Sequence, residues 1–149
     1  MRIISGKFGG RRIVVPKNLP IRPTTNLAKE SIFNIITNKS DLKNLKIADT
    51  FSGSGLIGLE FISRGSDVIF VEKNIKCFKH IVKTLKLLGL NNKVFKSDVF
   101  KYLQTSKQKF DYIFADPPYK FSYEQYLQLI KLIVNNNLRT DGLLIIEHF

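Results

Sequence analysis

Past residue 45, short apolar runs alternate with segments of helical periodicity, and this alternation constrains the fold more than any other feature of the chain. The apolar runs typical of buried strands are 46–51, 67–72, 93–97, 111–115 and 143–147. The segments with helical spacing between them are 55–63, 74–88, 99–104 and 123–134. Strands and helices that alternate through short connections form a parallel, doubly wound sheet. We therefore predict an α/β fold with a Rossmann-like sheet, and Ser122 with Gln125 predicts a capping box for its last helix.

The first 45 residues follow a different pattern. Two strand-like runs, Arg2–Ser5 and Arg11–Val15, flank a glycine-containing stretch and together predict a β-hairpin. Three prolines then favour an extended connection: Pro16, Pro20 and Pro23. After them, Thr24 and Thr25 can cap a helix over 26–37. The residues expected on the buried face of this helix are Ala28, Ile32, Ile35 and Ile36.

Positive charge is concentrated at the start of the chain. The sequence has 24 Lys and Arg residues against 12 Asp and Glu residues, a formal net charge of +12. The first 29 residues contain no acidic residue and seven basic ones: Arg2, Lys7, Arg11, Arg12, Lys17, Arg22 and Lys29. This distribution favours a polyanionic partner, although a solvated positive face is the alternative. We therefore predict a basic extension, 1–25, followed by the sheet-bearing domain, 26–149.

Several classes of protein are excluded by what the sequence lacks. The chain has one cysteine, Cys77, and cannot form an internal disulfide. No apolar run approaches the roughly 18 residues that span a bilayer, and the N-terminal residues do not resemble a signal peptide. No cluster of His and Cys residues offers a metal site. We expect a cytoplasmic protein with neither a membrane segment nor a metal.

Acidic residues end the first four predicted core strands: Asp49, Glu72, Asp98 and Asp116. Ligands of open α/β sheets bind beyond the carboxyl ends of the strands. A single acid at such a place is most simply a helix cap or a surface residue. Four in succession, in a chain with only 12 acidic residues, predict a site for a ligand with hydrogen-bond donors or positive charge.

A glycine motif lies between the first two of these acids. Gly53, Gly55 and Gly58 form a G-x-G-x-x-G pattern that opens a helix after a strand, and Glu72 follows Gly53 by 19 residues. This pattern is typical of sites for a nucleotide ribose and would fit a nicotinamide or flavin enzyme equally well. A tight turn without a ligand is the alternative. Asp49 favours S-adenosylmethionine, because a carboxylate would repel a pyrophosphate but attract an ammonium group.

The segment Asp116-Pro117-Pro118-Tyr119 follows the fourth predicted strand. Its two prolines fix the backbone and remove two N–H donors, which leaves carbonyls and a carboxylate as a rigid set of acceptors. Tyr119 can stack on a planar ring. Methylation of an exocyclic amine requires acceptors for the amine hydrogens, in-line placement of the methyl group and extrusion of the base from its helix. An ordinary Pro-Pro turn is the alternative for this segment.

Taken together, these features resemble the class I S-adenosylmethionine-dependent methyltransferases that carry a D-P-P-Y motif. More narrowly, the chain is similar to the bacterial 16S rRNA guanine-N2 methyltransferase family often called RsmD. The segments that carry the resemblance are Arg2–Arg12 (RIISGKFGGRR), Arg22–Thr25 (RPTT), Asp49–Gly55 (DTFSGSG), Gly58–Glu60 (GLE), Ser63–Gly65 (SRG) and Asp116–Tyr119 (DPPY). The resemblance extends over nearly the whole chain. The basic hairpin and RPTT are the more specific ones, since many methyltransferases share the others.

The resemblance implies a role for each matching residue. The methionine part of the cofactor would be held by Asp49, Phe51, Ser52, Gly53, Ser54 and Gly55. Glu72 would bind the ribose hydroxyls, and Asp98 with the Val99 backbone would face the adenine. Asp116 and the Pro117 carbonyl would bind the guanine amino group. Pro118 would stiffen this segment and Tyr119 would stack on the guanine ring.

The resemblance also implies a partner, 16S ribosomal RNA within an assembling small ribosomal subunit, bound by a monomer. The residues that would contact RNA phosphates are Arg2, Lys7, Arg11, Arg12 and Arg22. Family members continue past the fifth strand into a hairpin that completes a seven-stranded sheet. This sequence stops at Phe149, without strands six and seven. Either it is a fragment of a longer chain, or the edge of the sheet is incomplete and the fifth strand is exposed.

Three other functions share some of these features. A DNA or RNA adenine-N6 or cytosine-N4 methyltransferase shares the D-P-P-Y motif, but a DNA enzyme needs a recognition domain for which 149 residues leave no room. A nicotinamide-dependent oxidoreductase shares Gly53–Gly58 but gives no reason for Asp116–Tyr119. A non-catalytic RNA-binding or assembly factor would need the basic extension but not Asp116.

Overall fold

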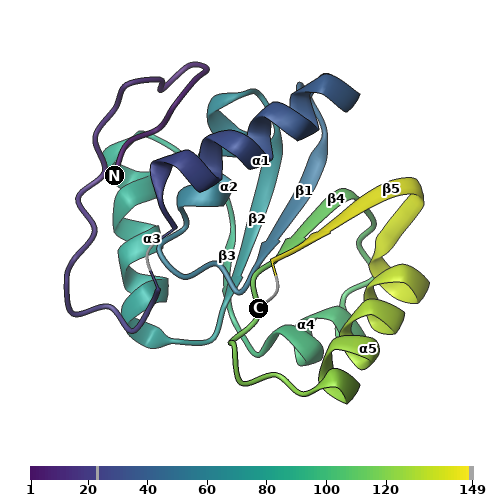
Figure 1. Ribbon diagram of the computed structural model, residues 1–149. Coiled ribbons are helices and arrows are strands. Elements are labelled where there is room, and N and C mark those ends of the chain that lie inside the picture. Colours follow the sequence, from purple (N-terminus) through teal and green to yellow (C-terminus); the bar gives the residue numbers. More distant parts are fainter. Residues whose placement is uncertain (23, 148–149) are drawn as a thin grey trace.

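A five-stranded sheet in the order β3-β2-β1-β4-β5 organises the molecule (Figure 1). The computed structural model describes residues 1–22 and 24–147. Every pair of neighbouring strands in this sheet is parallel. The strands are β1 (Lys46–Thr50), β2 (Asp67–Glu72), β3 (Val94–Lys96), β4 (Phe110–Ala115) and β5 (Leu138–Ile146). The predicted α/β class with a parallel sheet is confirmed.

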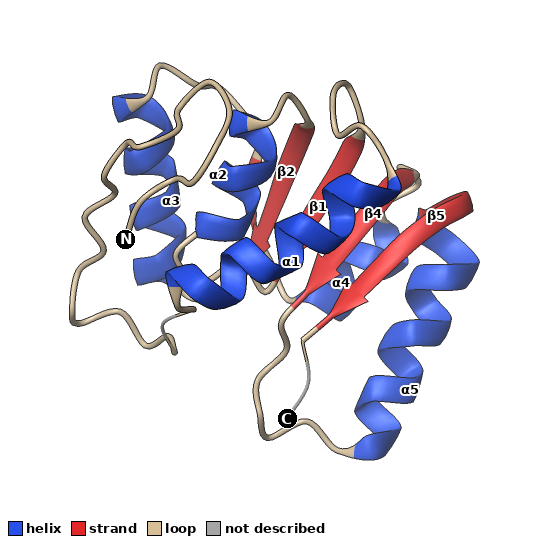
Figure 2. Ribbon diagram, turned by 45° about the horizontal axis from the view of Figure 1, so that its top comes forward, coloured by secondary structure: helices blue, strands red, loops and turns tan. Residues whose placement is uncertain are grey.

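Helices cover both faces of the sheet, as a doubly wound fold requires (Figure 2). One face packs against α1 (Asn26–Lys39), α2 (Leu56–Ser63) and α3 (Ile75–Leu87). The other face packs against α4 (Val99–Thr105), α5 (Tyr123–Leu132) and the π-helical turn η1 (Ile133–Asn137). No helix in the described residues is long and apolar enough to cross a membrane.

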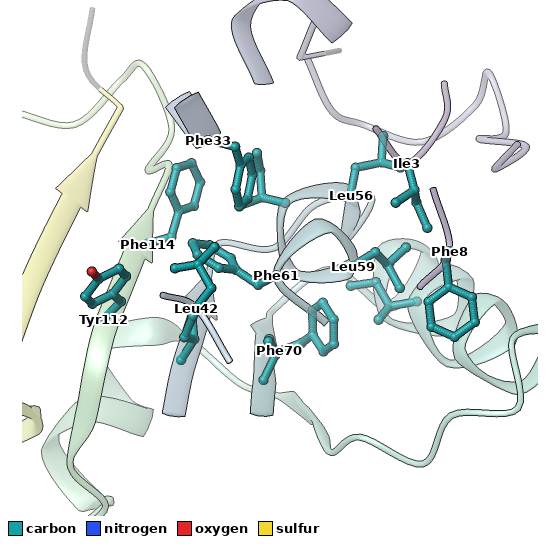
Figure 3. Close-up of a cluster of buried hydrophobic side chains, with 14 of the residues drawn as sticks. Ile3, Phe8, Phe33, Leu42, Leu56, Leu59, Phe61, Phe70, Tyr112 and Phe114 are labelled. Carbon is teal, nitrogen blue, oxygen red and sulfur yellow. The ribbon is translucent and has the colours of Figure 1, made fainter. Parts of the chain in front are cut away.

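Each central strand is apolar on both faces because successive side chains enter two different cores. In β2, Val68 and Phe70 belong to the core under α1, α2 and α3, whereas Ile69 and Val71 belong to the core under α4 and α5. Figure 3 shows the first core, in which the rings of Phe33 and Phe61 meet edge to face with centroids 4.7 Å apart. The continuous apolar runs of the sequence therefore reflect burial on two sides.

The fifth strand begins earlier than the sequence predicts. It starts at Leu138 and contains a register shift opposite Phe110–Tyr112. Asp141 has a φ of 67°, and Gly142 could not carry a side chain without meeting the carbonyl of Arg139 at 2.7 Å. An Asp-Gly pair is typical of a turn, so the predicted strand began only after it. The capping box of α5 at Ser122 is confirmed.

Helix α1 buries a different face from the predicted one. Lys29, Phe33 and Ile36 are buried, whereas Ala28 is exposed and Ile35 is 61% exposed. Ile36 alone was predicted correctly as buried, and Ile32 is half-buried. The predicted face was wrong because the buried stripe of the helix includes a charged residue, Lys29, and apolar periodicity does not identify a buried lysine. The predicted cap is confirmed, since the Thr25 hydroxyl accepts a hydrogen bond from the Ala28 N–H at 3.1 Å.

The N-terminal extension forms a narrow hairpin. Arg2 and Arg12 make an antiparallel bridge, with hydrogen bonds from Ile3 N–H to the Arg11 carbonyl and from Ile13 N–H to the Met1 carbonyl, each 2.9 Å. The chain then follows the α3 side of the molecule to the carboxyl edge of the sheet (Figure 1). Of the three prolines predicted to extend this segment, Pro23 lies outside the described residues. The domain boundary at residue 25 stays a prediction.

A buried group of charges, which we call the Glu60 cluster, holds the hairpin against α1 and α2. Glu60 accepts hydrogen bonds from the N–H groups of Ile4 at 2.9 Å and Ser5 at 3.1 Å. Arg64 Nε lies 3.0 Å from the second Glu60 oxygen, and Lys29 Nζ lies 3.4 Å from the first. Lys29 also donates to a backbone carbonyl of the hairpin at 2.7 Å. The position of the basic hairpin is therefore fixed by a side chain from α2.

Candidate functional site

The strand order reverses between β1 and β4, and ligands of such sheets bind beside this point at the carboxyl edge. Asp49, Glu72 and Asp116 all lie at this edge. The negative charges of Asp116 and Glu72 both contribute to raising the pKa of Asp49. The structure therefore brings three of the four predicted strand-end acids close enough to interact.

Asp49 is 1% exposed and supports the loop that follows β1. Its Oδ2 accepts a hydrogen bond from Gly58 N–H at 3.0 Å. Burial, ahead of the neighbouring acids, raises the pKa of Asp49 well above its ordinary value. A Cβ on Gly58 would lie 2.2 Å from the Phe70 ring and 2.9 Å from Asp49 Oδ2. The third glycine of the motif is therefore required by packing, and a role for Asp49 toward an ammonium group stays a prediction.

The turn between β1 and α2 has an unusual backbone. Gly53 and Gly55 have φ angles of 58° and 81°, and Phe51, which is not a glycine, has a φ of 54°. Left-handed backbone is uncommon for a bulky residue and is concentrated at functional sites. Ser52 stabilises the turn, since its hydroxyl donates to the Asp49 carbonyl at 2.5 Å. The N-cap residue of α2, Gly55, makes no side-chain cap, and within the first turn Asp49 accepts the Gly58 N–H, so the N–H groups ahead of Gly58 face the loop.

Glu72 connects this turn to the next loop. Its Oε1 accepts from Gly53 N–H at 2.7 Å and its Oε2 accepts from Asn74 N–H at 2.8 Å. Each carboxylate oxygen has two lone pairs, so both oxygens can still accept a hydroxyl. Asp98 is more ordinary: it is exposed and caps α4 by accepting from Lys101 N–H at 3.1 Å, and Val99 beside it is buried. The adenine roles of Asp98 and Val99 stay predictions.

The Asp116–Tyr119 segment leaves the end of β4 beside the turn. Pro117 is buried and Pro118 is exposed, while Tyr119 is 72% exposed. Burial and the neighbouring Glu147 raise the pKa of Asp116 to about 6, and Arg22 opposes the rise. At neutral pH this carboxyl is therefore mostly ionised and can accept hydrogen bonds.

Two features of this region were not found in the sequence. Glu147 follows β5 and shares Arg22 with Asp116, so five strands, not four, end in an acid. The available signal was its place as the last residue of the fifth predicted strand, 143–147. The second feature is an aromatic cluster centred on Phe121. Its ring contacts Phe51 with centroids 5.6 Å apart, Phe100 at 5.9 Å and Tyr126 at 5.6 Å. These rings form an apolar wall beside the turn, assembled from segments with no common sequence pattern.

The predicted RNA-binding residues occupy two places. Arg2, Lys7, Arg11 and Arg12 lie on the hairpin and are exposed. Arg22 lies at the carboxyl edge, where its guanidinium is 3.8 Å from both Asp116 and Glu147. Ile21 beside it reaches the turn, since a Cβ on Gly53 would lie 3.3 Å from the Ile21 side chain. Among the described residues, no three His, Cys, Asp or Glu side chains are arranged to hold a metal.

A doubly wound sheet, a glycine-rich turn after β1 and a D-P-P-Y segment after β4 define a class I S-adenosylmethionine-dependent methyltransferase. The Escherichia coli protein yhhF has a similar structure, with a TM-score of 0.84 and 27% identity over 98% of this chain and 78% of that chain. The Thermus thermophilus protein TTHA0928 gives a TM-score of 0.87 and 25% identity over 99% and 85% of the two chains.

The sequence leads to a particular family within this class. Residues 1–149 match the family described as Conserved hypothetical protein 95. The ribosomal RNA small subunit methyltransferase D of Buchnera aphidicola (subspecies Baizongia pistaciae) is 36% identical over 99% of this chain and 75% of its own length. The protein of the same name from Escherichia coli K12 is 29% identical over 97% and 72%. The chain belongs to the RsmD-like methyltransferase family, whose methyl donor is S-adenosylmethionine.

Proposed function

We propose that this protein transfers a methyl group from S-adenosylmethionine to the N2 amino group of a guanine in 16S ribosomal RNA. The observation that carries the proposal is Asp116, ionisable near neutral pH, at the start of a rigid Pro-Pro segment beside the glycine-rich turn. The names of the relatives support ribosomal RNA of the small subunit as the substrate. The guanine N2 position rests on the family resemblance and on the chemistry of this segment.

The residues around the turn fit the cofactor. Glu72 holds the turn through Gly53 N–H and retains lone pairs for two ribose hydroxyls. The N–H groups of α2 ahead of Gly58, where the N-cap residue Gly55 provides no side-chain cap, would bind the carboxylate of the methionine part. When bound, this cofactor supplies an electrophilic methyl group on a sulfonium. Phe51, in its left-handed conformation, and Phe121 would exclude water from that side.

The substrate amine would be held by acceptors from the chain. The ionised Asp116 carboxylate and the Pro117 carbonyl would accept the two amine hydrogens, which favours a more tetrahedral nitrogen. Tyr119 is exposed enough to stack on an extruded base. Because the Asp116 pKa is about 6, we expect methyl transfer to slow as the pH falls below that value.

The exposed arginines of the hairpin would contact RNA phosphates, and the anchored hairpin would set the register of the RNA relative to Asp116. An assembling small subunit as substrate and a monomeric enzyme are parts of the same proposal. The non-catalytic alternative keeps these contacts but requires no transfer.

The test is methyl transfer from radiolabelled S-adenosylmethionine to 16S rRNA, both free and within assembling subunits, followed by mass spectrometry of the nucleosides. We expect N2-methylguanosine in the RNA. Methylated adenine or cytosine, or transfer to DNA alone, would refute the guanine N2 assignment. RNA binding without transfer in either form of the substrate would favour the assembly-factor alternative. A matched control is Glu124→Gln, an exposed acid on α5, which should transfer at the wild-type rate.

A further inference from the structure

Two carboxyl groups lie side by side at the ends of β4 and β5. Ala115 pairs with Ile146, and Glu147 N–H donates to the Ala115 carbonyl at 2.9 Å, so the residues that follow the pair, Asp116 and Glu147, are neighbours across the strands. One guanidinium faces both: Arg22 lies 3.8 Å from Asp116 Oδ1 and 3.8 Å from Glu147 Oε1. Three charges from distant parts of the sequence therefore meet beside the D-P-P-Y segment.

The charges of this group do not balance when both carboxyls are ionised. Arg22 is half exposed and supplies one positive charge for two partly buried negative ones. Glu147 Oε2 is buried and receives no hydrogen bond from an amide, hydroxyl or cationic group in the described part of the chain. Two adjacent carboxylates resist simultaneous ionisation, and one proton between them removes the repulsion and satisfies the buried oxygen. Asp49, also buried, faces Asp116 from β1 and adds to the negative potential.

We propose that Glu147 is a positioning residue for Asp116, which rests on the methyl transfer proposed above. The pair receives the proton that the methylated amine loses: Asp116 takes it up, Glu147 accepts a hydrogen bond from the protonated Asp116, and Arg22 sets how firmly the proton is held. Without Glu147, Asp116 would be a single carboxylate beside an arginine, which is a good hydrogen-bond acceptor but a weak base.

The amine nitrogen forms a bond to the methyl carbon while the carbon–sulfur bond breaks, and the electron pair of that bond stays on sulfur as a neutral thioether. The nitrogen now carries the positive charge and passes one proton to the ionised Asp116 carboxylate. Glu147 accepts a hydrogen bond from the protonated Asp116, and the pair returns the proton to water. No other reactant is needed.

The first test measures the pair directly and needs no substrate. Protein labelled with ¹³C in the aspartate carboxyls is titrated by NMR, and the Asp116 signal is identified by its loss in Asp116→Asn. Glu147 raises the pKa of Asp116 and Arg22 lowers it. We therefore expect the Asp116 titration to move to lower pH in Glu147→Gln and to higher pH in Arg22→Gln. An unchanged Asp116 titration in Glu147→Gln would overturn the proposal.

A matched control lies at the other end of the same two strands. Arg139 forms a 3.1 Å ion pair with Asp111, and both residues are partly exposed, like Arg22 and its partners. Arg139→Gln removes an arginine–carboxylate pair between β4 and β5 without touching the carboxyl edge, and the Asp116 titration should not move.

The second test uses single-turnover methyl transfer as a function of pH. The rate should fall on the acid side as Asp116 takes up a proton. This acid limb should move to lower pH in Glu147→Gln. The rate at the plateau should be roughly 3-fold or more below that of wild type, because Asp116 alone is a weaker base than the pair. In Arg22→Gln the limb should move to higher pH. If wild type transfers methyl groups and Glu147→Gln has the same profile, the role of Glu147 is refuted and the proposed function stands. If wild type transfers none, the proposed function fails, and the proton-accepting role of the pair fails with it.

Discussion

Two groups of charges in this molecule are built from the same kinds of side chain and differ in how well they are satisfied. In the Glu60 cluster, one fully buried carboxylate meets two N–H groups at 2.9 and 3.1 Å and two cations, Lys29 and Arg64, at 3.4 and 3.0 Å. At the carboxyl edge, Asp116 and Glu147 share a single arginine at 3.8 Å. The first group has an excess of donors and the second has an excess of acceptors.

The difference separates a structural role from a chemical one. A buried charge is tolerated when each lone pair has a donor, and such a group then fixes one arrangement of the chain. The Glu60 cluster fixes the hairpin, although burial still lowers the pKa of Lys29. An under-compensated carboxyl is unfavourable for stability, but burial and a neighbouring acid can raise its pKa toward neutrality, as they do for Asp116, and proton transfer requires this. The predictions below test this contrast from the largest effect on stability to the smallest.

The largest effect is expected from Glu60→Gln. The substitution leaves Lys29 buried without its negative partner and removes the charge that holds Ile4 and Ser5. Breaking a buried ion pair on one side typically costs about 3–5 kcal/mol. The free energy of unfolding should fall by about that amount, measured by urea denaturation with far-UV circular dichroism, since the chain has no Trp.

The control for this prediction is Glu30→Gln, which removes the same charge from an exposed position next to Lys29. It should change the unfolding free energy by less than about 0.5 kcal/mol. If Glu60→Gln were no more destabilising than Glu30→Gln, the Glu60 cluster would not be what holds the hairpin.

An effect of the opposite sign is expected from Asp116→Asn. Burial raises the Asp116 pKa from 3.8 to about 6, so the folded state binds this proton more tightly than the unfolded chain does. The unfolding free energy therefore falls as the pH rises from about 4 to about 6, and ionised Asp116 is destabilising above that range. The shift corresponds to at most about 3 kcal/mol, and partial exposure reduces it to about 1–2 kcal/mol.

Asp116→Asn should accordingly be about 1–2 kcal/mol more stable than wild type at pH 8 and no more stable at pH 4. It should also lose at least about 100-fold in methyl transfer, because the amide is a poor acceptor for the transferred proton. Paired urea titrations at the two pH values and single-turnover assays measure both effects. Equal stability gains at pH 4 and pH 8 would show that ionisation of the Asp116 carboxyl is not what destabilises the folded wild-type protein.

The sequence was sufficient for the parts of the molecule that depend on neighbours along the chain. The β–α alternation, the cap of α5 at Ser122 and the acids at the carboxyl ends of β1, β2 and β4 were all placed correctly. The register of α1 was wrong because its buried stripe includes Lys29, whose partner Glu60 lies 31 positions further on. Pairings between charged residues at such separations leave no periodic signal.

The same limit explains what was missed at the site. The family resemblance assigned Arg22 to RNA, whereas the structure also gives it two acidic partners from the ends of β4 and β5. Glu147 is the last residue of the fifth predicted strand, but its importance depends on β5 lying next to β4. Strand order is a property of the whole sheet. A local sequence pattern can therefore place Glu147 at the end of a strand, but it cannot show that Asp116 lies beside it.

The smallest effect on stability is expected from substitution of the hairpin arginines. These residues belong to neither charge group, so they test RNA binding separately from both. Arg11 and Arg12 are exposed, and neither guanidinium forms an ion pair with a described residue. The double variant Arg11→Gln/Arg12→Gln should unfold within about 0.5 kcal/mol of wild type. It should bind 16S rRNA more weakly, with a plot of log affinity against log salt that is shallower by about 1.4–1.8, because each phosphate contact contributes about 0.7–0.9. The matched control, Lys107→Gln/Lys131→Gln, removes two exposed charges elsewhere; an equal loss of slope there would mean that RNA binding follows net charge and not the anchored hairpin.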